Sequence, residues 1–321
     1  GARYQRAKLG QEAARWETGA TRDEIFFQVA QLYFQVLKSE KLVVVAEQEV
    51  TQLQEHLKIA QDLYQFGLVN YNDVLQAQVA LADARQRLIT ARNQVVQSRS
   101  TLNKYLGLPI SQPTKLKDET SLALPQWDLP TATTEALDNR SDLKALERRV
   151  RQGEKVITEA RAHYLPRFYV QAGQTYQQND RTVHDTQYFA ILGLQWNLFA
   201  GLETKAQVVQ ARERLAQLQI QHRDLAEQAK LEVQNAYLSL KETAERISVT
   251  KDAVTQGEEN LRLNEERYKE QVGTATDVID AQTLLTKARV NYYTALYDHQ
   301  VNKARLLRAV GKINQLAPAD A

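Results

Sequence analysis

Two carboxylates toward the C-terminal end of the chain are spaced so that together they could attract or repel charged solutes. Asp277 and Asp280 lie three residues apart in a predicted helix, so both side chains share one helical face. Carboxylates held close together in a confined space favour cations and repel anions. Asp277 has a structural alternative, because aspartate suits a helix N-cap. For Asp280 the alternative is an ordinary solvated helix face.

The chain carries none of the residue constellations that enzymes or metal sites use. Its five histidines lack metal-ligand spacing, and they are His56, His163, His184, His222 and His299. P-loop, Gly-x-Ser-x-Gly and His-Glu-x-x-His motifs are missing from the sequence. We therefore expect no catalytic residue, no cofactor and no metal, and hence no enzyme.

The composition narrows the possible partners. The 321 residues contain 41 Lys and Arg against 39 Asp and Glu, a net charge of +2, which argues against a nucleic-acid partner. Cysteine is absent, which suits an exported protein. No apolar run reaches the roughly 18 residues that a membrane-spanning helix needs. If the chain meets a bilayer, we expect it to do so with strands.

The elements that would position Asp277 and Asp280 belong to an internal repeat. The segment 64–78 aligns without a gap with 268–282, an offset of 204 residues. Gly67 interrupts a long helical pattern at 2–66, and Asn72 or Asp73 is the expected cap of the next helix. A repeat of this length predicts two copies of one long helical hairpin.

Both return helices have coiled-coil seams. The first seam consists of Val74, Ala77, Leu81, Ala84, Leu88, Ala91 and Val95, and the second of Val278, Ala281, Leu285, Ala288, Tyr292 and Ala295. This alternation of three- and four-residue steps over three heptads is typical of helices packed in pairs. The frequent alanines predict a close approach of the helices.

Between the repeats the sequence changes character. Residues 108–132 hold four of the six prolines and are expected to form a linker, followed by one helix over 133–166. Segments 168–176 and 188–199 then alternate with the period of two that strands have.

The second strand has one apolar face, formed by Leu192, Leu194, Trp196 and Leu198. About ten residues per strand with terminal aromatics are typical of a transmembrane barrel hairpin. A soluble hairpin with one face on a core is the alternative. The expected division is thus a first hairpin (1–107), linker (108–132), upper helix (133–166), strand pair (167–200), second hairpin (201–312) and tail (313–321).

In this order, several short motifs resemble the TolC family of outer-membrane efflux channels. They are the two turns at 64–78 and 268–282, Asn139-Arg140-Ser141-Asp142-Leu143, Tyr164-Leu165-Pro166 before the first strand and Asn197-Leu198-Phe199-Ala200-Gly201 after the second. The resemblance covers nearly the whole chain. The family has glycine where Gln271 stands, so we expect a different shape for the second turn.

The resemblance implies a mainly α protein of the Gram-negative outer membrane, with its helices in the periplasm. It implies a homotrimer in which each protomer gives four strands to one transmembrane β-barrel and helical hairpins to an α-barrel tunnel. The implied partners are a periplasmic adaptor protein, an inner-membrane transporter of the RND or ABC type, and outer-membrane lipid. Only two strands are visible here, so we expect an N-terminal helix and a first strand pair to be missing from this sequence.

The resemblance also assigns residues. It places the tunnel constriction at Asp277 and Asp280, where threefold symmetry would make rings of carboxylates. Gly67 and Gly273 are expected to reverse the chain at the tips. The expected adaptor-docking residues at the tips are Phe66, Gly67, Leu68, Asp73, Val272, Gly273 and Thr274. Tyr64 and Tyr268 are expected either to bridge neighbouring helices through their hydroxyls or simply to pack, and Leu192, Leu194, Trp196 and Leu198 are expected to face lipid.

A second function remains open from the sequence. A periplasmic coiled-coil adaptor or scaffold without channel activity would share the helical hairpins. It would not need the alternating strand that contains Leu192 and Leu198. An efflux or secretion duct, opening by movement of one hairpin against the other, is the favoured function.

Overall fold

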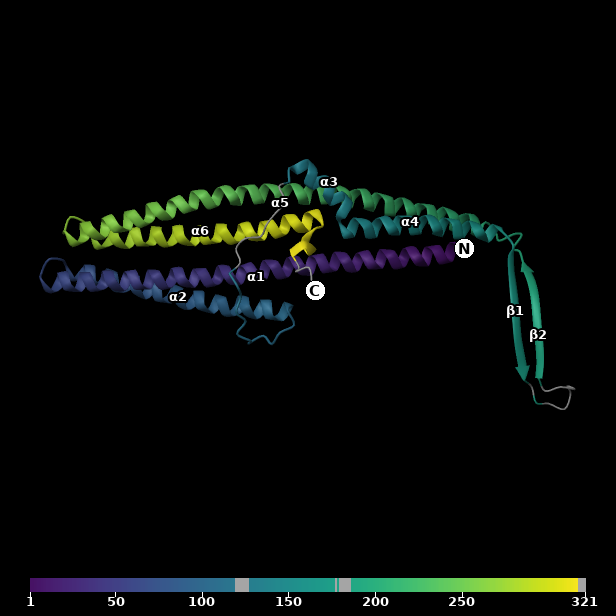
Figure 1. Ribbon diagram of the computed structural model, residues 1–321, viewed down its shortest axis with the longest axis horizontal. Coiled ribbons are helices and arrows are strands. Elements are labelled where there is room, and N and C mark those ends of the chain that lie inside the picture. The colour runs from purple at the N-terminus through teal and green to yellow at the C-terminus, as the bar shows by residue number, and fades with distance from the viewer. Residues whose placement is uncertain (119–126, 177, 179–185, 317–321) are drawn as a thin grey trace. The chain divides into compact units, whose positions relative to one another are not determined.

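A computed structural model of the chain describes residues 1–118, 127–176, 178 and 186–316 (Figure 1). Its elements are α1 (Ala2–Gln65), α2 (Tyr71–Tyr105), α3 (Leu129–Asn139), α4 (Ser141–Arg161), η1 (Ala162–Tyr164), β1 (Arg167–Tyr176), β2 (Thr186–Gln195), α5 (Glu203–Lys269), α6 (Ala275–Val310) and η2 (Ile313–Leu316). The predicted mainly α class, with long helical hairpins and one strand pair, is confirmed.

The chain packs as two compact units, each built from segments distant in sequence. One unit contains residues 1–20 and 141–228, and the other contains residues 21–140 and 229–321. The helices α1 and α5 each contribute to both units. The units therefore cut across the consecutive segments expected from the sequence.

In the larger unit, the two seams meet at the ends of the hairpins. Ala60 of α1, Val74 and Ala77 of α2, Leu261 and Tyr268 of α5, and Val278, Ala281 and Leu285 of α6 form one buried apolar cluster. Small side chains let the helices come close: a methyl group on Gly257 of α5 would lie 3.3 Å from Cα of Leu285. The seam pattern thus produces the hairpin pairing that it predicts, with α2 against α1 and α6 against α5 (Figure 1).

One buried asparagine at the end of α2 holds the start of the predicted linker in place. The side chain of Asn103, at the end of α2, donates from Nδ2 to the carbonyl oxygens of Pro109 (3.3 Å), Ile110 (3.2 Å) and Gln112 (2.9 Å). Its Oδ1 accepts from the hydroxyl of Thr114 at 2.7 Å. This hub stabilises the irregular segment, whose residues 119–126 lie outside the described residues.

The single helix expected at 133–166 is wrong: the chain forms α3 and α4 with a break at Arg140. Arg140 is extended (φ −59, ψ 126), almost fully buried, and paired through Nη1 with Oε2 of Glu232 at 2.6 Å. Gly311, which ends α6 with φ +78, packs so close that a methyl group there would lie 2.9 Å from the backbone nitrogen of Arg140. This tertiary contact interrupts a sequence that is locally helical.

In the smaller unit, ion pairs and small residues hold α4 against the start of α1 and of α5. Glu159 pairs with Arg3 and Arg6, each at 2.9 Å, and Glu17 pairs with Arg149 at 2.5 Å. Leu215 and Leu218 of α5 pack on Gly153 of α4.

The strands β1 and β2 pair antiparallel, with Arg167 opposite Gln195 and Tyr176 opposite Thr186. The second strand was expected to run from 188 to 199, but it ends at Gln195. Trp196 and Leu198 therefore lie beyond the strand, although the alternating pattern continues through them. The pairing stops because β1 begins at Arg167 and offers no further partner.

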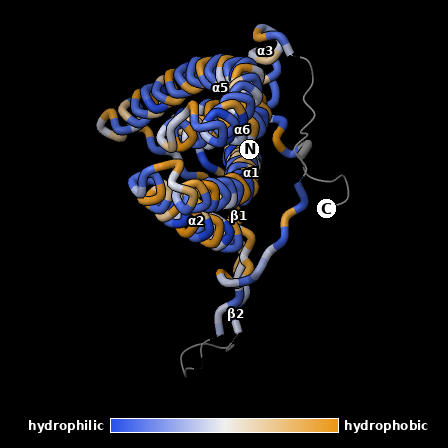
Figure 2. Tube along the Cα trace, turned by 90° about the vertical axis from the view of Figure 1, so that its left-hand side faces the viewer, coloured by the Kyte–Doolittle hydropathy of each residue, from blue (hydrophilic) through white to orange (hydrophobic). Residues whose placement is uncertain are grey.

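Figure 2 shows polar and apolar positions interspersed along the helices. Among the helices of the described residues, none combines the length and the apolar character that crossing a bilayer requires.

Candidate functional site

The first tip joins α1 to α2 through a tight turn that depends on Gly67. The N–H of Leu68 donates to the carbonyl of Leu63, and that of Gly67 to the carbonyl of Tyr64, both at 2.9 Å. This is a Schellman helix end, which requires a left-handed residue, and Gly67 has φ +69. Phe66 and Leu68 project from the turn and are exposed.

The second tip has the same hydrogen bonds at the equivalent positions. Val272 donates to Arg267 at 2.9 Å and Gln271 to Tyr268 at 3.0 Å. The left-handed residue is here Gln271, with φ +62. The expectation of a different shape at this turn is therefore wrong: a non-glycine residue adopts the conformation that glycine adopts in the first turn.

Gly273 has a different task from Gly67. Its φ lies outside the left-handed region, but a methyl group on it would lie 3.1 Å from Cβ of Arg267 and 3.3 Å from the nitrogen of Tyr268. Its N–H also donates to the carbonyl of Arg267 at 3.0 Å. Gly273 is thus needed for the close approach of the chain to the end of α5.

Asp277 lies in the first turn of α6 and takes part in its cap. Thr274 is the N-cap, so the expectation that Asp277 itself occupies that position is wrong. The N–H of Asp277 donates to Oγ1 of Thr274 at 3.2 Å, and the N–H of Thr274 donates to Oδ2 of Asp277 at 2.9 Å. The hydrogen bond from the Thr274 backbone to the carboxylate, followed by the Thr274 side chain and by Arg267, lowers the pKa of the Asp277 carboxyl.

The equivalent cap in the first hairpin is weaker. The N-cap of α2 is Asn70 rather than Asn72 or Asp73, and its side chain makes no capping bond. Asp73 corresponds to Asp277 in the repeat, but its Oδ2 lies 3.5 Å from the hydroxyl of Tyr268, which points to it from the other hairpin.

Asp280 lies one turn further along α6 and is exposed to solvent. Its side chain has no hydrogen bond or ion pair within the part of the chain that the structure describes. Its counterpart Gln76 instead accepts a hydrogen bond at Oε1 from the hydroxyl of Thr276 at 3.1 Å. The pair Asp277 and Asp280 therefore presents two carboxylates at the tip, one fixed by a cap and one free.

Tyr268 joins the two hairpins beneath the tips. Its ring is 2% exposed and lies 5.1 Å, centroid to centroid, from the ring of His56 on α1. Burial, reinforced by Asp73, raises the pKa of the Tyr268 hydroxyl to about 12. Burial lowers the pKa of His56 to about 4, and its buried Nε2 has no hydrogen-bond partner among the described residues. The repeat alone gives no signal for His56, because the contact joins different copies.

Tyr64, the counterpart of Tyr268, stays at the surface. Its ring is 45% exposed and packs at 5.3 Å from Tyr71 within its own turn. Among the described residues, only Tyr268 of these two tyrosines reaches the other hairpin through its hydroxyl.

The register of the strand pair divides its residues into two faces. Leu192 lies opposite Val170 and Leu194 opposite Phe168, and all four side chains are exposed. On the other face, aromatic rings cover glycines, because methyl groups on Gly193 and Gly173 would overlap Tyr169 and Phe189. Phe168 and Val170 thus extend the apolar face expected from the second strand alone.

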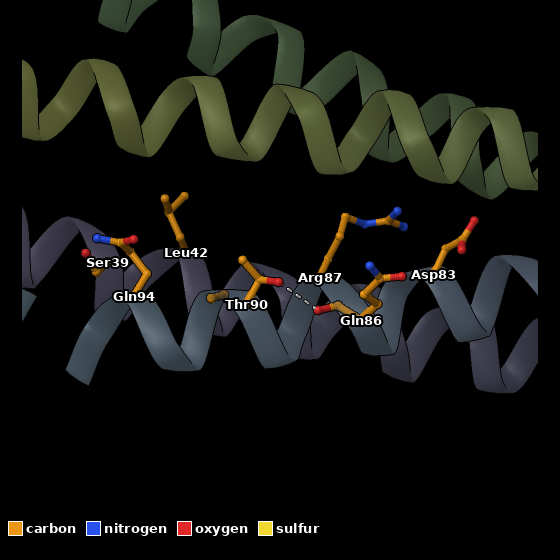
Figure 3. A pocket seen from close by; sticks show the side chains of 8 residues that line it. Ser39, Leu42, Asp83, Gln86, Arg87, Thr90 and Gln94 are labelled. Atoms are coloured by element: carbon orange, nitrogen blue, oxygen red, sulfur yellow. Dashed lines mark hydrogen bonds between the residues drawn. The ribbon is translucent and has the colours of Figure 1, made fainter. Parts of the chain in front are cut away.

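A groove that the sequence did not predict runs along the first hairpin (Figure 3). It is lined by Ser39, Leu42, Asp83, Gln86, Arg87, Thr90, Ala91 and Gln94, and it encloses about 480 Å³. Arg87 also pairs with the buried Glu49 of α1 through two hydrogen bonds of 2.9 and 3.2 Å. Because the lining comes from two helices, no local motif signals the groove.

Within the described residues, no group of three His, Cys, Asp or Glu side chains could hold a metal ion.

Comparison with known proteins gives the chain a family. The family described as "Outer membrane efflux protein" matches residues 1–108 and 132–312. The outer membrane efflux protein BepC of Brucella suis is 22% identical over 292 residues, which are 89% of this chain and 63% of BepC. The outer membrane protein TolC of Escherichia coli is 22% identical over 313 residues, 91% of this chain and 62% of TolC. The chain therefore spans less than two thirds of the length of these relatives.

Solved structures share the fold. VceC of Vibrio cholerae superposes with a TM-score of 0.84 at 19% identity, over 97% of this chain and 75% of VceC. The open state of the MtrE outer membrane channel of Neisseria gonorrhoeae gives a TM-score of 0.82 at 18% identity, over 97% and 72%. The family match extends over both helical hairpins, α4 and the strand pair, and the chain accordingly belongs to the outer membrane efflux protein family.

Proposed function

We propose that this chain forms most of one protomer of an outer-membrane channel of the TolC type, a passive and non-enzymatic duct for efflux or secretion. The observation that carries the proposal is the coexistence, in one family member, of two hairpins packed side by side near their tips and a strand pair with one apolar face. An adaptor or scaffold would have no use for exposed Phe168, Val170, Leu192 and Leu194 on one side of a hairpin.

The strand pair supports insertion into the outer membrane. Each strand has ten residues, which fits the roughly 9–11 residues of a tilted transmembrane β-strand. Two strands cannot close a barrel, and open strand edges are not tolerated in lipid. The barrel therefore needs further strands and other copies of the protein, as in a homotrimer, whose helices would lie in the periplasm.

The two tips are the proposed site of gating and docking. In a trimer, Asp280 and Asp277 would form two rings of three carboxylates and select for cations at the tunnel entrance. The exposed Phe66, Leu68 and Val272 with the accessible turns around them offer a surface for a periplasmic adaptor, which would connect the duct to an inner-membrane transporter. The contact between Thr276 and Gln76 is one that movement of one hairpin past the other would break.

The first experiment is fractionation of the protein expressed from its own gene, including whatever flanking sequence that gene encodes. We expect a detergent-resistant trimer in the outer membrane and restored drug efflux in a host without its own channel. A monomer released with the periplasm would favour the adaptor or scaffold function and contradict the proposal.

A second experiment tests the tip. Cysteine at position 280, oxidised to link neighbouring protomers, should block transport, and reduction should restore it. A matched cysteine at exposed Asp224 serves as the control. Transport that is unchanged by the crosslink at 280 would contradict gating at the tip.

A further inference from the structure

The segments that connect the strands to the helices expose an unusual amount of apolar surface. We define the junction as residues 161–167 and 196–205, which flank β1 and β2. Its exposed large apolar side chains are Tyr164, Leu165, Trp196, Leu198, Phe199 and Leu202. Nearly all of them stand outside a helix or strand, so their exposure is not the outer face of an amphipathic element.

One of these residues, Leu202, has an unfavourable backbone conformation. Leu202 has φ +68 directly after Gly201 with φ +55, and the leucine side chain is 71% exposed. Left-handed backbone is unfavourable for a residue with a Cβ, and leucine lacks the short polar side chain that eases it. An exposed leucine gains no packing within the chain that would offset this cost. A contact with a partner outside this chain is therefore expected at Leu202.

The same segments carry unpaired cations. Arg161 ends α4, Arg167 begins β1 and Lys205 lies in the first turn of α5, and all three are exposed. None of the three forms an ion pair with another residue that the structure describes. The one acidic residue of the junction, Glu203, accepts a hydrogen bond from Gln207 at 2.9 Å. The junction thus combines apolar side chains with a net positive charge.

The strand register gives the depth of the junction. The apolar face of the strand pair ends at Phe168 and Leu194, at the base where β1 and β2 join the helices. Residues just beyond the apolar face lie at the membrane–water boundary, where tryptophan and tyrosine are enriched. Trp196 donates from Nε1 to the carbonyl oxygen of Tyr164 at 3.2 Å, and this bond holds the two connections together at that level.

We propose that the junction binds the headgroups of anionic glycerophospholipids in the periplasmic leaflet, with Arg161 and Lys205 on the phosphates and Trp196, Phe199 and Leu202 among the upper acyl chains. Arg167 is not part of this site, because it lies on the face of β1 opposite Phe168. The inference rests on the proposed outer-membrane insertion and adds a lipid class to it. A zwitterionic lipid would satisfy the apolar side chains equally well. The charge complementarity selects the anionic lipid, since each cation near such a surface favours it by about fivefold.

The test uses the complete trimer in mixed vesicles of phosphatidylcholine and phosphatidylglycerol. Native mass spectrometry after release from the vesicles counts the lipids of each class that stay bound. The variant R161Q/K205Q is compared with the control R223Q/K241Q, which removes two exposed cations further along α5. We expect the wild type and the control to retain phosphatidylglycerol preferentially, and the junction variant to lose that preference by at least tenfold.

The outcomes separate this inference from the proposed function. A trimer in the outer membrane without preference for phosphatidylglycerol would overturn the inference alone. Absence of the wild type from the membrane would overturn both. A junction variant that inserts, keeps its lipid preference and loses binding of a soluble periplasmic adaptor would assign the surface to protein and also overturn the inference.

Discussion

The two hairpin tips have the same backbone and different chemistry. Both end in the same pair of hydrogen bonds, but the left-handed position holds Gly67 in one turn and Gln271 in the other. The cap of the first return helix lacks a side-chain bond, whereas Thr274 and Asp277 form a reciprocal pair. The second tip is therefore the more constrained of the two, although it contains the more strained residue.

The difference continues beneath the tips. Tyr64 lies on the surface of the first hairpin, while Tyr268 is buried between the hairpins with its hydroxyl aimed at Asp73. The two copies of the repeat thus place the same residue type, tyrosine, in an exposed position in one hairpin and in a buried position in the other. The contacts of Tyr268 with Asp73 and His56 join unlike copies and are not part of the repeated seams.

The largest expected effect is the difference between the two tyrosines. Tyr268→Ala should lower the free energy of unfolding by about 3–5 kcal/mol, because it empties a buried aromatic site. Tyr64→Ala should lower it by less than about 1 kcal/mol, since that ring is half exposed. Urea unfolding of the purified protein measures both.

Tyr268→Phe is the control for the hydroxyl, whose bond to Asp73 is long at 3.5 Å. We expect a loss of under about 1 kcal/mol for this variant. Equal losses for Tyr268→Ala and Tyr64→Ala would show that the tips do not pack as described.

The second effect is a pH dependence that His56 of the first hairpin introduces. His56 has an ordinary pKa of 6.5 when unfolded and about 4 when folded, because burial disfavours its charged form. The unfolded chain therefore binds the proton first, and stability is lost as pH falls from about 6.5 toward 4. Between pH 7 and 4.5 the loss should be about 2–3 kcal/mol.

His56→Asn isolates this contribution, because asparagine is the residue at the equivalent position 260 of the second hairpin. The variant should show a shallower decline of stability in the same pH range. Parallel curves for the variant and the wild type would contradict a buried neutral His56.

Much of the fold follows from local sequence. The seams of Val74–Ala84 and Val278–Leu285 predict the hairpins, because helix pairing depends on spacing that is visible within one segment. The break at Arg140 and the end of β2 at Gln195 do not follow from such spacing. Gly311, which is 171 residues away in sequence, packs directly against the first, and β1 offers no residue before Arg167 to pair beyond the second.

The candidate site was predictable to a similar degree. The positions of Asp277, Gly67 and Gly273 at the turns follow from the repeat, but their individual tasks do not. That Gln271 takes the left-handed conformation depends on the hydrogen bonds of the turn, which outweigh the preference of the residue. The contact between the rings of His56 and Tyr268 joins α1 to α5, and no pattern within either helix predicts it.

The third effect exchanges the left-handed residues of the two turns. Gln271→Gly should raise the free energy of unfolding by about 0.5–1 kcal/mol, because relief of the backbone strain exceeds the added entropy of the unfolded chain. Gly67→Gln should lower it by a similar amount. Thermal unfolding measures both, and two changes of the same sign would contradict the shared turn geometry.

The smallest effect on stability, and the sharpest separation of roles, concerns the two carboxylates of the second tip. Asp277→Asn weakens the cap with Thr274 and should lower the Tm by on the order of 1–2 °C. The effect should vanish in acid, since the lowered pKa of Asp277 means that its stabilisation is lost as pH falls through that pKa. Asp280→Asn should leave the Tm unchanged, because its side chain is exposed without a partner in the described part of the chain.

In the trimer both variants should reduce the preference of the channel for cations, measured as a reversal potential across a salt gradient. If Asp280→Asn changed stability but not selectivity, Asp280 would be a structural residue, and the comparison of the two tips would lose its functional meaning.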